Sequence, residues 1–240
     1  MTYKKITLAL MGLIGSAALG SASAATFLDT SLTDPPGVYF GSGNANSHFT
    51  VDRSGSFEIG LSAITRFQGP ITPVGNVYDV PTGATTVPGK TGSAWGFVFS
   101  INNDYNGASD IAVANTNNFN YKLTLQDVSL GTTGFFDPNI IPDNSRNADN
   151  TAFQNSETLS FSSIRALLGD PMYDLNANDT YIFTLDVLDK VTGASLASNS
   201  ITVVAGTGAP TAVPEPLTLS LFAAGLLGAG ALRRRKKVQA

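Results

Sequence analysis

The sequence predicts an all-β fold, an antiparallel β-sandwich or jelly-roll-like domain, flanked by an N-terminal signal helix and a C-terminal single membrane-spanning helix. Three observations lead to this prediction: apolar and polar residues alternate along several short runs, no long run repeats every 3.6 residues between the two ends, and Gly, Pro, Asn and Asp separate the runs. Alternation places the large side chains on one face of a strand, which a half-buried sheet requires. Several short strands separated by turn residues are typical of a sandwich or barrel.

The strand candidates follow one another along the chain. They are residues 48–53, 56–67, 95–102, 110–114, 120–128, 157–162, 180–188 and 195–205. Alternation is clearest at Trp95, Phe97, Phe99 and Ile101, which occupy every second position. A turn-forming stretch between the last two runs predicts a hairpin loop. Only residues 163–168 predict a short helix or turn.

The N-terminus predicts export. Lys4 and Lys5 precede the apolar run 6–19, and Ala22-Ser23-Ala24 places small residues where signal peptidase requires them. We therefore expect residues 1–24 to be a secretory signal peptide that signal peptidase removes. The apolar run is shorter than the roughly 20 residues of a membrane span, which argues against a permanent anchor.

The body that follows is expected to be one extracellular domain over residues 25–204, with a flexible linker of small uncharged residues at 205–212. The chain has no cysteine, so sheet packing rather than disulfides must stabilise the domain. The formal net charge is −4. Without the two basic ends, seven Lys and Arg oppose seventeen Asp and Glu, a net −10. Such an acidic body disfavours nucleic acid and other polyanions as partners.

The C-terminus has three parts in a fixed order. The first part is Pro214, Glu215 and Pro216. Residues 217–232 then carry no charge and predict a transmembrane helix of about 24 Å, short against the roughly 30 Å core of a bilayer. The basic cluster that follows, which holds this end in the cytoplasm, consists of Arg233, Arg234, Arg235, Lys236 and Lys237. The two prolines fix φ and keep the motif extended just outside the membrane.

This order resembles the PEP-CTERM sorting signal of exported proteins of Gram-negative bacteria, over residues 213–237. The resemblance implies that a membrane enzyme of the exosortase type recognises the tail and processes the protein near the Pro-Glu-Pro motif. Pro214, Glu215 and Pro216 would then be substrate residues and not catalytic ones. The resemblance also implies a periplasmic domain, transiently anchored in the cytoplasmic membrane, that later reaches the cell surface or is secreted. A role in biofilm or exopolysaccharide is implied in the same way.

One polar loop resembles a calcium-binding loop. Asn102, Asp104, Asn106 and Asp110 have the spacing of EF-hand positions 1, 3, 5 and 9. However, Val113 occupies the position of the bidentate glutamate. Two interpretations stay open, a weak Ca²⁺ site and an Asn/Asp-Gly turn between strands. Apart from this Ca²⁺ the sequence predicts no cofactor and no metal.

The sequence predicts no catalytic residues. His48 is the only histidine and no cysteine is present, so a nucleophile with a histidine base would have to use His48. A glycosidase would need two carboxylates about 5 to 10 Å apart, for which the mature region offers Glu58, Glu157 and fifteen aspartates. Phe135 and Phe136 fit either sugar stacking or core packing.

We therefore expect a non-catalytic surface or matrix protein with a structural, adhesive or exopolysaccharide-associated role. The alternative is a secreted polysaccharide-acting hydrolase or a carbohydrate-binding module.

Overall fold

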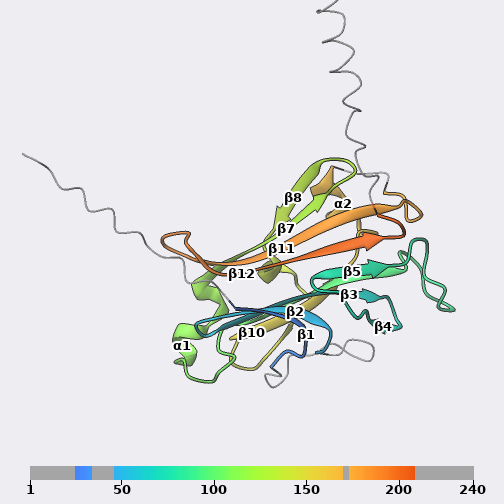
Figure 1. Cartoon of the computed structure of the whole chain (residues 1–240). Coiled ribbons are helices and arrows are strands. Elements are labelled where there is room, and N and C mark those ends of the chain that lie inside the picture. Colours follow the sequence, from blue (N-terminus) through green and yellow to red (C-terminus); the bar gives the residue numbers. More distant parts are fainter. Residues whose placement is uncertain (1–24, 34–45, 170–172, 209–240) are drawn as a thin grey trace, which may run out of the picture.

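Two β-sheets packed face to face form the body of the protein. The structure is a computed structural model that describes residues 25–33, 46–169 and 173–208 (Figure 1). The all-β prediction is confirmed, with short helices only at the ends and edges of the sheets. The predicted signal peptide, the predicted span 217–232 and the sorting tail lie outside the described residues. Within the described ranges no helix is long and apolar enough to cross a membrane.

The larger sheet is antiparallel throughout. Its strands in spatial order are β1 (Ala25–Thr30), β2 (Phe49–Ser54), β3 (Phe57–Thr65), β6 (Trp95–Asn102), β10 (Ala152–Glu157) and β9 (Ser145–Arg146), and β4 (Gly69–Pro70) pairs with the end of β3. β3 and β6 form the centre of this sheet, with Leu61 opposite Phe99.

The smaller sheet contains the longest strands. Its order is β5 (Val77–Val80), β12 (Ser195–Ala205), β11 (Asp179–Asp189), β7 (Phe119–Asp127) and β8 (Thr132–Phe136). β11 and β12 form the predicted hairpin, whose loop contains Gly193 at φ 71°. β5 pairs with β12 in parallel, so the prediction of a wholly antiparallel sandwich is wrong at this edge. The chain reaches β5 from β4 in the other sheet, and it therefore enters without a hairpin that would reverse its direction.

The core lies between the two sheets and is rich in aromatic rings. Trp95, Phe97, Phe99 and Ile101 are all buried, as their alternation predicts. The ring of Phe97 lies 4.6 Å from that of Phe183 in the opposite sheet. Each such ring stabilises the fold by roughly 2 to 3 kcal/mol through its removal from water. A second, smaller cluster covers the outer face of the larger sheet and consists of Leu32, Phe49, Val51, Ile64 and Val98.

In the part of the chain that the structure describes, four short helices connect the strands. They are α1 (Ile111–Ala114), η1 (Thr116–Asn118), η2 (Pro138–Ile140) and α2 (Ser162–Leu168). α2 corresponds to the predicted short helix and ends at Gly169, whose φ of 67° suits glycine. The helix packs closely on β8, because a Cβ on Gly134 would lie only 2.7 Å from the carbonyl carbon of Leu167.

Two predicted strands are wrong. Residues 110–114 form α1 instead, because the Asp110 side chain accepts the Ala112 N–H at 2.8 Å and caps a helix. Residues 157–162 lie mostly in a turn, and the strand itself is β10, which ends at Glu157. The alternation in β10 is hidden because Asn155 and Glu157 share the inward face with Phe153.

The domain remains ordered slightly beyond its last strand. Ala205 ends β12, the Gly206 N–H donates to the Val80 carbonyl at 3.0 Å, and the Gly208 N–H donates to the Ala205 carbonyl at 3.0 Å. The first residues of the predicted linker therefore form a turn against β5. Figure 1 shows that this exit lies at the opposite end of the sandwich from α1 and the β11–β12 loop.

Candidate functional site

Glu58 is a structural carboxylate. Its side chain is 1% exposed and accepts three hydrogen bonds, from Arg53 Nε at 2.7 Å, the Thr33 N–H at 2.9 Å and Thr33 Oγ1 at 3.2 Å. Arg53 also lies over the rings of Phe27 and Tyr105, at 4.9 and 5.6 Å. These contacts attach the segment after β1 to the sheet. They occupy the oxygens of Glu58 that a catalytic acid would need.

Glu157 is in a different electrostatic environment. It lies on the inward face of β10, opposite Phe97. Burial, and next the charge of nearby Asp143, raise the pKa of Glu157 to about 7. Asp143 is held beside β10 because its Oδ1 accepts the side-chain N–H of Asn155 at 3.0 Å. Glu157 is thus a glutamate with a second carboxylate acting on its pKa.

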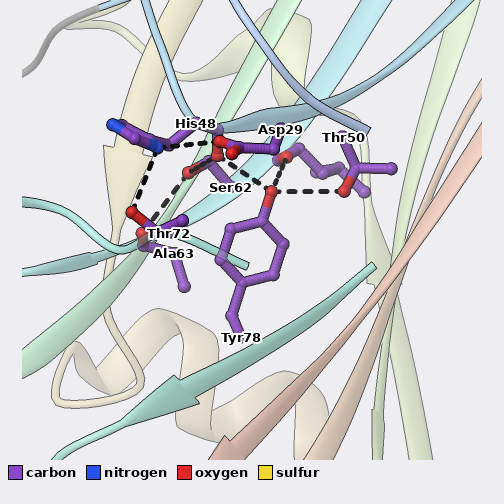
Figure 2. A network of polar contacts seen from close by, with 8 residues as sticks. Asp29, His48, Thr50, Ser62, Ala63, Thr72 and Tyr78 are labelled. Carbon is purple, nitrogen blue, oxygen red and sulfur yellow. Dashed lines mark hydrogen bonds and ion pairs between the residues drawn. The ribbon is translucent and has the colours of Figure 1, made fainter. Parts of the chain in front are cut away.

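His48 forms part of a polar network between β1, β2 and the residues after β3 (Figure 2). Its ring Nδ1 lies 2.8 Å from Asp29 Oδ1 and 3.3 Å from Thr72 Oγ1. A catalytic triad needs the carboxylate and the nucleophile on different ring nitrogens, whereas here both oxygens reach the same one.

The backbone of His48 explains the rest of this network. Its φ of 63° is unusual for a residue other than glycine. The hydroxyls of Tyr78 and Ser62 donate to its carbonyl oxygen at 2.9 and 3.0 Å. Burial raises the pKa of Tyr78, and its hydroxyl remains a proton donor. The network therefore fixes a strained turn at the start of β2.

The polar loop after β6 contains two Asx turns, at Asn102 and Asn106, and a longer bond from the backbone to Asp104. Asn102 Oδ1 accepts the Asp104 N–H, Asp104 Oδ1 accepts the Ser109 N–H, and Asn106 Oδ1 accepts the Ala108 N–H. Asp110 caps α1, as described above. Each of the four candidate calcium ligands thus accepts a backbone N–H, which supports the turn interpretation. Among the described residues no group of three or more His, Cys, Asp or Glu side chains converges as a metal site would require.

The two adjacent phenylalanines have different environments. Phe136 is partly buried and packs against the core. Phe135 is 62% exposed, and Lys122 Nζ lies 5.0 Å from its ring centroid. Adjacent residues of β8 point to opposite faces of the sheet, so Phe136 packs against the core and Phe135 lies on the surface.

A second group of exposed rings was not predicted from the sequence. Arg66 Cζ lies 4.8 Å from the ring centroid of Phe67 and 5.9 Å from that of Phe161. Lys90 Nζ lies 5.1 Å from the same Phe67 centroid. We call these four residues the Arg66 cluster. They come from three separate parts of the chain, so no sequence spacing could reveal them.

The described domain and the C-terminal tail together define a class of protein. Such a protein has an all-β domain followed by a C-terminal sorting segment. Residues 212–236 match the family model of the PEP-CTERM protein-sorting motif, which confirms the resemblance stated for residues 213–237. The chain therefore carries a PEP-CTERM sorting motif, which implies export and processing by an exosortase-type enzyme. Pro214, Glu215, Pro216 and the basic cluster lie within the matched segment, outside the residues whose structure is described.

No curated protein matches the sequence. Among solved structures, the soluble domain of PmoD from Methylocystis sp. ATCC 49242 (Rockwell) is similar to this chain at 8% sequence identity and a TM-score of 0.28. The similarity covers 65% of this chain and 96% of that chain. A TM-score this low carries no argument about fold or function.

Proposed function

We propose that this protein is a non-catalytic structural or adhesive component of the cell surface or of an exopolysaccharide matrix in a Gram-negative bacterium. Signal peptidase removes residues 1–24, and the β-domain folds in the periplasm. The tail holds the domain at the cytoplasmic membrane until an exosortase-type enzyme cuts near Pro214, Glu215 and Pro216. The protein then passes to the surface or the medium.

The observation that carries this proposal is the match of residues 212–236 to the sorting motif, directly after a β-domain. The environments of the candidate catalytic residues support the non-catalytic part. The oxygens of Glu58 accept hydrogen bonds from Arg53 and Thr33, and the His48 ring has Asp29 and Thr72 on one nitrogen. In each case the side chain acts as a structural contact.

Mass spectrometry of the protein from its native host tests the sorting route. The mature chain should begin at Ala25 and end near the Pro-Glu-Pro motif. Replacement of Pro214, Glu215 and Pro216 together by alanine should leave the tail attached and the protein in the membrane fraction. Pro210→Ala, four residues upstream, is the matched control and should be processed normally. A wild-type chain that still ends at Ala240 would contradict the proposal.

The hydrolase alternative depends on Glu157, because its pKa of about 7 suits a general acid. We expect no release of reducing ends from acidic or neutral polysaccharides by the purified protein. Release that Glu157→Gln abolishes, while the fold is retained, would replace our proposal by the enzyme.

A further inference from the structure

The Arg66 cluster contains two cations that no carboxylate neutralises within the described part of the chain. The salt bridges there join Arg53 to Glu58 and His48 to Asp29, and neither involves Arg66 or Lys90. Arg66 Nη1 instead donates to the carbonyl oxygens of Thr91 and Ser93, at 3.3 and 3.5 Å. Burial without an acidic partner lowers the pKa of Arg66, although the guanidinium stays charged at neutral pH. The net charge of −10 disfavours polyanions for the body as a whole, but here two cations lie near one ring, with Arg66 Cζ 4.8 Å and Lys90 Nζ 5.1 Å from the Phe67 centroid.

The rings of the cluster are partly open to solvent. Phe67 is 46% exposed and Phe161 is 44% exposed. Phe67 lies in the turn between β3 and β4 with a φ of 63°, a conformation that favours glycine or asparagine. A large ring in this strained and exposed position does not contribute to the core. The guanidinium of Arg66 therefore lies close to two half-exposed rings, with the Lys90 ammonium over one of them.

We propose that the Arg66 cluster is a binding site for acidic sugar units, uronates in particular, of a polysaccharide. The carboxylate of such a unit can accept two parallel N–H bonds from a guanidinium, and Lys90 adds a second positive charge. The C–H face of the sugar ring can pack on an exposed phenylalanine. This inference rests on the proposed matrix function and names the chemistry of its ligand.

An anionic membrane surface is the competing partner, because the cluster lies at the end of the domain from which the tail leaves. Hydrogen bonds between backbone groups connect the two places: Gly206 to Val80, Ala94 to Gly83, and Arg66 to Ala94. However, two cations are fewer than the roughly four to eight of a lipid-binding basic segment. A polymer of acidic sugars needs only one unit in each site, and its many units raise the overall affinity by multivalency.

The test measures binding of the full chain, purified in mild detergent, to immobilised polygalacturonate, with neutral dextran as the comparison. Wild-type protein should bind polygalacturonate, not dextran, and bind it less tightly as salt is added. Arg66→Gln and Lys90→Gln should each weaken binding about tenfold, as expected for a hydrogen bond or ion pair to a charged group. Lys122→Gln removes the same charge beside the exposed ring of Phe135 and is the control that should bind like wild type.

The aromatic part is tested separately. Phe67→Asn removes the ring while suiting the backbone conformation and should weaken binding, whereas Phe67→Tyr should retain it. Thermal unfolding of each variant shows that the fold is intact. Equal binding by wild type and Arg66→Gln, or no binding of polygalacturonate at low salt, would overturn the proposal. Binding only to phosphatidylglycerol vesicles, lost in Arg66→Gln, would assign the cluster to lipid. Because the tail is not involved, these results do not depend on the sorting test.

Discussion

Replacing Glu157 by glutamine should make the protein more stable at neutral pH, because burial and the nearby Asp143 penalise its ionised form. The ordinary pKa of 4.5 rises to about 7 in the folded protein. Between pH 4.5 and 7 the Glu157 carboxyl is ionised in the unfolded chain but still protonated in the folded protein. The free energy of unfolding therefore falls as pH rises. Below pH 4.5 both states are protonated and the effect disappears. Above pH 7 the loss is complete.

The size of this loss follows from the two pKa values. At about 1.4 kcal/mol for each pH unit, the upper limit is about 3 kcal/mol. Because Glu157 is only partly buried and water screens its charge, we expect roughly half of this, about 1 to 2 kcal/mol. Glutamine has a similar shape and no charge, so Glu157→Gln should gain that amount above pH 7 and nothing at pH 4.5. Asp143→Asn should give a smaller gain, since it removes only the second cause of the raised pKa.

Urea unfolding at several pH values, followed by the fluorescence of Trp95, measures this difference. Trp95 is the only tryptophan and is 1% exposed in the fold, so its fluorescence changes when unfolding exposes it to water. The difference between Glu157→Gln and wild type isolates Glu157 from the other carboxyls that titrate. A difference that does not change with pH, or a variant less stable than wild type at pH 7.5, would refute the electrostatic argument.

Two other substitutions test contacts that the fold depends on. Glu58→Ala leaves the Arg53 guanidinium and the Thr33 N–H without their acceptor and should destabilise the protein by about 2 to 4 kcal/mol in urea unfolding. Glu58→Gln should lose less stability because it keeps an acceptor oxygen. Equal losses in the two variants would contradict the ion-pair account. Gly134→Ala places a Cβ 2.7 Å from the Leu167 carbonyl carbon and should lower the free energy of unfolding by about 1 to 3 kcal/mol as α2 shifts. The neighbouring Thr133→Ala is the control and should have a mild effect. A Gly134→Ala variant as stable as wild type would show that α2 is not tightly packed on β8.

Alternation predicted the strands that carry large residues on a single face. Residues 95–102 and 195–205 coincide with β6 and β12, because Trp95, Phe97, Phe99 and Ile101 all face the opposite sheet. The strands that the sequence missed lack this contrast. β10 points Asn155 and Glu157 inward, and β1 exposes Phe27 and Leu28 on its two faces. β5 and β8 are short edge strands, and β5 pairs with β12, which is far away in the chain.

Residues that act as a local segment were easier to predict than residues that meet in space. The sorting tail is a continuous signal, and its order alone identified it. Loops between different strands bring Asp143 close to Glu157. In the same way, loops bring the cations Arg66 and Lys90 close to Phe67. The loop from Asn102 to Asp110 was only partly predictable. Its side-chain oxygens could either bind a cation or accept backbone N–H groups, and the hydrogen bonds in the structure show that they accept backbone N–H groups.

The position of β12 has a consequence for the timing of export. β12 is the last strand of the described residues, yet it lies between β5 and β11 and contacts the other sheet through Asn199, whose side chain donates to the backbone carbonyl of Thr50. A chain that crosses a membrane N-terminus first cannot close the smaller sheet until residue 205 has emerged. At that moment only a few residues separate the domain from the Pro-Glu-Pro motif. In such a chain the sorting motif thus emerges at nearly the same time as the domain becomes able to fold.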